Sequence, residues 1–166
     1  MRIRSLMTRC YCLLCITFLS FGCFQDATVL SRSDKAAIFK VCLTIAFIEK
    51  RLPDSHFFNK AEFIPLSARN IKGDSIPNIP GFSFRLLDST QLGNRADSLG
   101  DFTFIEFHNI VQTPNGSVIV TLNHSWALSQ KTRNRRVMMM SGGAMDILCY
   151  KRFGEWTGEV TRSVIY

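Results

Sequence analysis

The sequence lacks the motifs that commonly carry catalysis or metal binding. Its histidines, His56, His108 and His124, have no metal-ligand spacing, and the HExxH and GxSxG motifs are absent. Ser141-Gly142-Gly143 is not a phosphate-binding loop, because no Lys-Ser/Thr pair follows it. These absences exclude the common zinc-protease, serine-hydrolase and phosphate-loop patterns. We therefore expect no metal and no cofactor, and an enzyme is the less favoured class.

The chain also lacks an uninterrupted apolar run of the length that a transmembrane helix needs, about 20 residues. Residues 10–21 form a shorter apolar run, and residues 1–9 before it hold three arginines and no acid. A positive segment followed by an apolar stretch of 7–15 residues is typical of a signal peptide. We expect residues 1–22 to direct export and to be removed, although an uncleaved anchor is an alternative.

Residues 19–23 (LSFGC) resemble the lipobox of bacterial lipoproteins. In that family the cysteine is diacylated and becomes the mature N-terminus, so the resemblance implies lipidation of Cys23. Ser20 and Phe21 depart from the family pattern, which has Leu and a small residue there. More than one acyl chain gives stable anchoring. The expected location is the bacterial cell envelope, membrane-anchored and facing the periplasm or the exterior; secretion is the alternative.

Few cysteines remain once a signal peptide is removed. Cys42 and Cys149 are then the only ones inside the domain. An oxidising compartment permits a disulfide between them. Free cysteine is also among the most buried residue types. We favour two buried thiols, and the bridge stays open as the alternative.

Charge gives little support for nucleic acid as a partner. The net charge is +7, and removal of Arg2, Arg4 and Arg9 leaves 17 basic against 13 acidic residues. The dense basic cluster lies at residues 129–136 and consists of Lys131, Arg133, Arg135 and Arg136. A solvated loop is the simpler interpretation, and anionic lipid is the sharper alternative.

The hydrophobic pattern predicts one domain. A tether at residues 23–33 precedes a helix over residues 34–51, capped by Ser33 or Asp34, whose apolar residues recur every three or four positions. The prolines and glycines of residues 53–100 indicate short elements: a helical turn at 57–62, strands at 62–66 and 82–87, and a helix at 88–95. Four longer strands are expected as an antiparallel meander at 102–111, 117–128, 137–153 with a break at Gly142-Gly143, and 156–165.

Turn chemistry sets the expected strand register. An Asn115-Gly116 hairpin turn places His108 opposite Asn123 and Glu106 opposite Ser125. A second turn at Gly154-Glu155 closes the last hairpin. One continuous apolar face then holds Ile105, Phe107, Val111, Val118, Val120, Leu122, His124, Trp126, Leu128, Met145, Ile147, Cys149, Phe153, Trp156, Val160 and Val164. A helix packed on such a face defines an α+β domain, residues 34–166, with one long helix on a curved antiparallel sheet of four or more strands.

This arrangement resembles the cystatin-like and NTF2-like α+β rolls. Residues 149–158 (CYKRFGEWTG) resemble a hairpin that closes many small exported bacterial proteins of uncharacterised families. The roll resemblance implies a pocket between helix and sheet and no definite function.

Two groups of side chains are candidates for a site. Glu106, His108 and Asn123 share the polar face, where a carboxylate can orient a histidine as a general base, although a solvated sheet face is the favoured interpretation. His124, Trp126 and Phe107 share the apolar face, as polar and aromatic walls of a ligand pocket or as core.

Three functional hypotheses follow. The first, which we favour, is a non-enzymatic, lipid-anchored envelope protein that binds a partner protein. The second is a small-molecule-binding roll with a pocket near His124 and Trp126. The third is a hydrolase or isomerase that uses His108 with Glu106.

Overall fold

The computed structural model describes residues 30–58, 61–135 and 142–166, so the expected signal peptide, Cys23, Arg136 and residues 137–140 lie outside the described residues. The described chain is an α+β domain around an open six-stranded sheet of order β2-β1-β3-β4-β5-β6. The strands are β1 (Ile64–Ser67), β2 (Phe84–Leu87), β3 (Phe102–Gln112), β4 (Val118–Ala127), β5 (Gly143–Arg152) and β6 (Glu155–Ile165). The helices are α2 (Arg32–Leu43), α3 (Ser89–Leu99) and α4 (Gln130–Arg133), with a π-helical turn Thr44–Ile48 and a 3-10 turn Ser55–Phe58.

The first helix differs from the single long helix expected over residues 34–51. α2 begins at Arg32, because Ser31 caps it by accepting a hydrogen bond from the Asp34 backbone N–H at 3.0 Å. After Leu43 the chain widens into the π-helical turn, where the Glu49 N–H donates to the Thr44 carbonyl, five residues back. Most of the apolar run is buried as expected, over two kinds of helix, but Ile48 at its end is 49% exposed.

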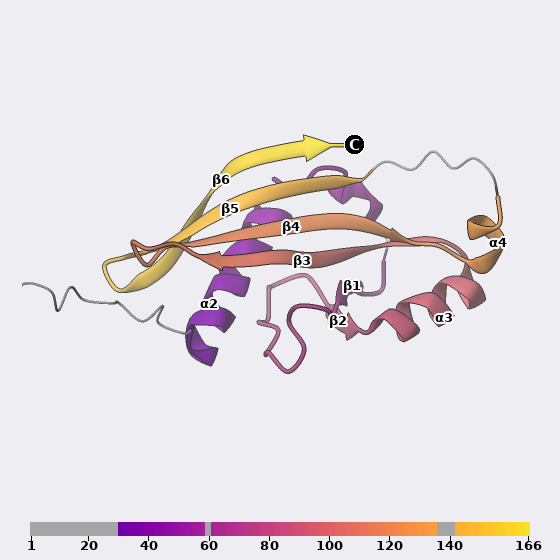
Figure 1. Cartoon of the computed structure of the whole chain (residues 1–166), viewed down its shortest axis with the longest axis horizontal. Coiled ribbons are helices and arrows are strands. Elements are labelled where there is room, and N and C mark those ends of the chain that lie inside the picture. Colours follow the sequence, from indigo (N-terminus) through magenta and orange to yellow (C-terminus); the bar gives the residue numbers. More distant parts are fainter. Residues whose placement is uncertain (1–29, 59–60, 136–141) are drawn as a thin grey trace, which may run out of the picture.

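The sheet is mixed, whereas a purely antiparallel one was expected. Strands β3 to β6 form the predicted antiparallel meander. Strand β1, however, lies parallel to both β2 and β3. Parallel strands cannot be joined by a tight hairpin and need a crossover connection. The helix α3 supplies it between β2 and β3, and Figure 1 shows α3 beside these strands at the end of the sheet where α4 also lies.

The register of the β3–β4 hairpin is shifted from the expected one. Gln112 pairs with Val118, so the turn comprises residues 113–117 instead of two residues, and the Thr113 N–H donates to the Ser117 carbonyl at 2.8 Å. A β-bulge at His108 shifts the pairing again by one. Glu106 is consequently opposite Asn123, and His108 has no partner in the β4 register.

Despite the shifted register, most side chains of the hairpin lie on the face of the sheet that was expected for them. A shift of two residues keeps every side chain on its face, because the strand period is two. Ile105, Phe107 and Leu122 are therefore buried as expected. Beyond the bulge the faces change, and Val111 is 51% exposed instead of buried.

The β5–β6 hairpin turns one residue earlier than expected. Arg152 pairs with Glu155, so Phe153 and Gly154 form the turn with φ of 54° and 85°. Two consecutive positive φ values are typical of a tight turn that matches the sheet twist. Phe153 is thereby placed at the hairpin tip and is 94% exposed, so its expected place on the apolar face is wrong.

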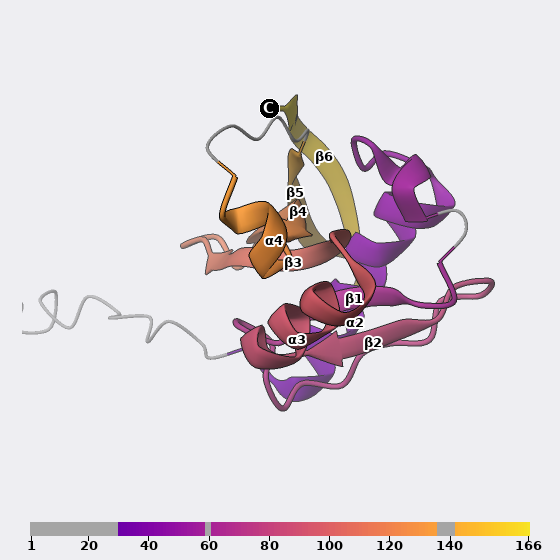
Figure 2. The same cartoon turned by 90° about the vertical axis from the view of Figure 1, so that its right-hand side faces the viewer.

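Helices pack on both faces of the sheet. On one face the main core joins α2 and the π-helical turn to β3, β4 and β5 through residues such as Phe39, Leu43, Phe107 and Ile147. On the other face α3 contributes Leu92 and Ala96 to a second cluster, with Phe63, Leu87 and Ala127. Figure 2 views the twisted sheet from the end at which α3 and α4 lie.

Candidate functional site

An aromatic cleft opens at the end of the sheet where β3 begins and β4 ends. Its volume is about 260 Å³, and its walls include Phe57, Phe58, Phe63, Arg95, Phe102 and Trp126. We refer to these residues as the aromatic cleft. They come from four places in the chain: the 3-10 turn, the residue before β1, helix α3, and the adjacent ends of β3 and β4.

The 3-10 turn forms one wall of the cleft. Asp54 begins it with a positive φ of 55°, and the Phe57 N–H donates to the Asp54 carbonyl at 3.2 Å. The turn buries Phe58 but leaves the neighbouring Phe57 41% exposed. The Phe57 ring meets Trp126 edge to face, with ring centroids 5.4 Å apart. An exposed phenylalanine beside a tryptophan is the kind of apolar surface that binding sites present.

His124 lies directly behind this wall. Its side chain is fully buried, and the rings of Phe57 and Phe58 lie 5.6 and 5.3 Å from the imidazole. Neither ring nitrogen has a hydrogen-bond partner in the part of the chain that the structure describes. Burial lowers the pKa of His124, an effect that the Asp54 charge opposes and the His56 charge reinforces. A buried imidazole that lacks both partners is an unmet hydrogen-bonding capacity next to the cleft.

The other two residues predicted for the pocket, Trp126 and Phe107, lie in different parts of the structure. Trp126 lines the cleft, as expected. Phe107 belongs to the main core, where its ring packs against Phe39 at 4.6 Å between centroids. The predicted set therefore gives one wall residue of the cleft, one residue behind the wall, and one core residue.

Arg95 is a cleft residue that the sequence reasoning missed. Its guanidinium lies 4.7 Å from the Phe63 ring centroid and 5.6 Å from that of Phe102. Among residues 30–58, 61–135 and 142–166 it makes no ion pair. No sequence signal marked it, because an arginine near the end of a short predicted helix is indistinguishable from a solvated one.

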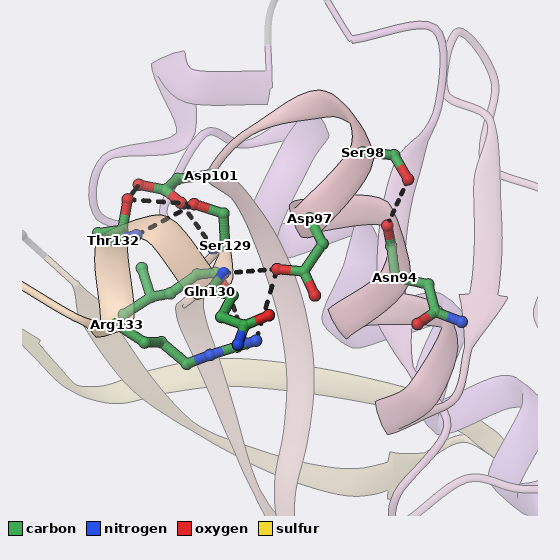
Figure 3. Close-up of polar contacts among 9 residues, drawn as sticks. Asn94, Asp97, Ser98, Asp101, Ser129, Gln130, Thr132 and Arg133 are labelled. Atoms are coloured by element: carbon green, nitrogen blue, oxygen red, sulfur yellow. Dashed lines mark hydrogen bonds and ion pairs between the residues drawn. The ribbon is translucent and has the colours of Figure 1, made fainter.

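Asp101 is another wall residue of the cleft, and its carboxylate is hydrogen-bonded to residues at the start of α4 (Figure 3). Its carboxylate accepts hydrogen bonds from the Ser129 N–H at 2.7 Å and the Thr132 hydroxyl at 2.6 Å. These bonds hold the pKa of Asp101 below its usual value. Asp97, one helical turn earlier, accepts from the Gln130 N–H and lies 3.4 Å from Arg133. The two aspartates thus fix α4 against α3.

This junction changes the interpretation of the basic cluster. Arg133 is ion-paired with Asp97 and also donates to the Leu128 carbonyl at 2.6 Å. Lys131 and Arg135 are exposed. The expected loop thus contains a short helix, which places Lys131, Arg133 and Arg135 near the cleft end of the sheet.

The candidate catalytic residues do not converge. Glu106 is buried opposite Asn123, and its Oε1 atom lies 3.7 Å from Arg69 Nη1. His108 is exposed at the bulge, and its backbone carbonyl accepts from Asn70 Nδ2 at 2.8 Å. Glu106 and Asn123 therefore face each other across β3 and β4, whereas His108 is exposed and has no partner in the register.

A polar notch of about 480 Å³ lies at the opposite end of the sheet, beside the start of α2. Asp34 Oδ1 there accepts a hydrogen bond from Trp156 Nε1 at 2.7 Å and lies 2.9 Å from Lys151 Nζ. These contacts and the Ser31 hydroxyl hold the pKa of Asp34 far below its usual range. Asp34 thus links the start of α2 to Trp156 and Lys151 of the β5–β6 hairpin.

The described residues contain no cluster of three potential metal-ligating side chains, and none of their helices is long and apolar enough to cross a membrane. No family model, curated protein or solved structure matches the chain.

Proposed function

We propose that this chain is an exported, non-enzymatic binding protein, held to a membrane through Cys23, that binds a small amphipathic molecule in the aromatic cleft. Export and anchoring rest on residues 1–23 of the sequence. Binding rests on the cleft. The proposal keeps the lipid anchor of the first hypothesis and the small-molecule ligand of the second. It puts that ligand in the aromatic cleft, whereas the second hypothesis expects a pocket between the N-terminal helix and the sheet.

The observation that carries the binding proposal is the buried His124 behind the aromatic wall. Unpaired polar atoms in a native interior are uncommon and call for an explanation. Here two of them lie behind Phe57, the most exposed ring of the cleft. A ligand that packs against a shifted Phe57 ring can bring its own polar group to the imidazole and satisfy it.

The walls define the chemistry of the ligand. Aromatic rings on several sides favour a flat apolar body, as in most small-molecule sites. Arg95, without an ion-pair partner among the described residues, favours a negatively charged group on that body. We therefore expect an aromatic or amphipathic anion.

Fluorescence tests this expectation. The sequence has two tryptophans, and Trp156→Phe leaves Trp126 of the cleft as the only reporter. The probe is 8-anilinonaphthalene-1-sulfonate, an aromatic anion that accepts energy from excited tryptophan. Saturable binding of one probe per protein, with quenching of Trp126, is the expected result. Absence of saturable binding would contradict a ligand site and return support to a protein partner.

Matched variants separate the cleft from general surface adsorption. Phe57→Ala removes a half-exposed ring from the wall and should weaken probe binding by about 1 kcal/mol, roughly five-fold. Phe153→Ala removes the more exposed ring at the hairpin tip and should leave binding unchanged. Equal weakening by both would show that the probe adsorbs to exposed aromatics.

A second pair tests the preference for an anion. Arg95→Gln should weaken binding of the sulfonate probe but not of the uncharged N-phenylnaphthylamine. Arg85 also stacks on Phe63, at 4.2 Å, but is not a wall residue, so Arg85→Gln is the control. If both probes respond alike to Arg95→Gln, the arginine shapes the cleft and does not select charge.

The anchor has its own test. The intact mass of protein extracted from its host's membranes should correspond to a chain that begins at Cys23 and carries added acyl mass. A soluble species that begins near Cys23 without that mass would refute anchoring and favour secretion. The result does not affect the test of the cleft.

A further inference from the structure

Two cysteines face each other in the core. Cys42 of α2 and Cys149 of β5 are both fully buried, and their Sγ atoms lie 3.8 Å apart. They are separated by 107 residues along the chain and come from the two layers of the domain. Within the described residues they are the only cysteines.

A glycine beside the pair lets the two layers pack closely. Gly158 pairs with Cys149 across the β5–β6 ladder, and a Cβ atom at Gly158 would lie only 2.8 Å from Val41 of α2. The absent side chain thus lets α2 approach the sheet directly beside the cysteine pair. A disulfide has an S–S length of about 2.05 Å, so closure needs an approach of about 1.8 Å between the sulfur atoms.

We propose that Cys42 and Cys149 form a disulfide in the exported protein and so link α2 covalently to the sheet. The setting rests on the export part of the proposed function, because such bonds persist in oxidising compartments. The oxidant is a disulfide, carried by a thiol oxidoreductase or by oxidised glutathione. One cysteine thiolate attacks it and releases one thiolate of the carrier; the second cysteine then displaces the other carrier thiolate. The two thiols lose two protons and two electrons, and the carrier disulfide is reduced to two thiols.

Burial dictates when the bond forms. The thiolate is the reactive species, and burial raises the pKa of the Cys42 thiol well above its usual value. Exchange is therefore faster before the core closes than after it. The linkage is a structural one that forms during folding, and the folded core then shields it from reductants.

Peptide mapping tests the Cys42–Cys149 bond directly, independently of the other cysteines of the full chain. The full chain is unfolded in reductant, refolded in a buffer of reduced and oxidised glutathione, alkylated and cleaved with trypsin. Trypsin releases Cys42 in residues 41–50 and Cys149 in residues 137–151. The expected product is these two peptides joined, two hydrogen masses below their sum. Recovery of both peptides as separately alkylated species would overturn the proposal, as would linkage of either to another cysteine.

Stability gives a second readout. Closing a loop of this size should raise the midpoint of thermal unfolding by about 10 °C relative to the same chain refolded in reductant. The double variant Cys42→Ala/Cys149→Ala keeps the core apolar and should not respond to reductant. An equal response of the double variant would overturn the assignment to this pair.

The same peptide mapping, applied to protein extracted from the host, tests whether the chain lies in an oxidising compartment as well as whether the disulfide can form. Joined peptides from the host support it. A bond that forms on refolding but is absent from the host protein refutes an oxidising location, hence export. That outcome overturns the disulfide of the exported protein and leaves ligand binding in the cleft to its own test.

Discussion

Replacing Gly158 with alanine tests how tightly α2 packs against the sheet. A Cβ atom at this position would lie 2.8 Å from Val41 Cγ1, 3.1 Å from Ile147 Cγ2 and 3.3 Å from Ile45 Cδ1. Ordinary van der Waals contact begins at 3.4 Å, so the nearest neighbour must move by about 0.6 Å. Val41 is β-branched and stiff in a helix, so much of this displacement falls on the helix itself.

The expected cost follows from overpacking. Extra methyl groups in a packed core typically cost about 1–3 kcal/mol, and with three close neighbours we expect about 2 kcal/mol. Urea unfolding, followed by circular dichroism, measures the change in the free energy of unfolding. Gly93→Ala is the matched control, because Gly93 lies inside α3 with no atom near its Cβ position. It should stabilise the protein by about 0.5–1 kcal/mol.

A rescue variant makes the reasoning refutable. Val41→Ala removes the closest atom, so the double variant Gly158→Ala/Val41→Ala should be less destabilised than the sum of the single variants by about 1 kcal/mol or more. Additive effects, or a loss below about 0.5 kcal/mol for Gly158→Ala alone, would show that α2 does not press on the sheet at this point.

Three further predictions concern polar groups. Because folding lowers the pKa of Asp34, its ionised carboxylate stabilises the protein above the unfolded carboxyl pKa near 4. That stabilisation is lost as pH falls toward the folded pKa. Asp34→Asn should therefore cost about 1–2 kcal/mol at pH 7 and flatten the fall in unfolding free energy below pH 4. An unchanged acid profile in that variant would show that other carboxyls dominate. His124→Phe removes two unpaired buried nitrogens and should raise the unfolding free energy by about 1 kcal/mol, whereas a loss would mean that the imidazole has a partner. Asp101→Ala releases the Ser129 contact and should speed tryptic cleavage after Lys131 several-fold in the native protein, with Asp88→Ala, at the start of α3, as the control.

The β3–β6 meander and its helical cover were predictable from the sequence. Alternating apolar residues and the Asn115-Gly116 and Gly154 turn signals locate four strands, and the dense apolar run of residues 36–48 locates the cover. Register was not predictable, because a bulge such as that at His108 leaves no mark on the alternation. The parallel pairing of β1 was hidden for a related reason: strands of four residues carry too little pattern to show direction.

The candidate site was predictable only on its sheet side. Trp126 and His124 stand on a long strand whose alternation assigns them a face. Phe57, Phe63 and Arg95 reach the cleft from a turn, a strand start and a helix, in the segment where prolines and glycines interrupt every periodicity. Their convergence depends on the parallel β1–β3 pairing and on the α3 crossover, both of which are long-range features of the chain.

The placement of the two ends of the sheet bears on the role of the basic residues. The described chain begins at Leu30, on the polar notch beside the β3–β4 turn, and the aromatic cleft lies at the other end of β3. Figure 1 shows α2 near one end of this long strand and α3 near the other. Strand β3 has 11 residues, which at about 3.3 Å each separates the ends by roughly 35 Å. The exposed Lys131 and Arg135 lie near the cleft end, far from Leu30, and add positive charge beside the aromatic cleft. Such charge speeds the diffusional encounter with an anionic ligand. Charge reversal at both residues should therefore slow association of the sulfonate probe, and an unchanged association rate would show that the two residues do not act on the cleft.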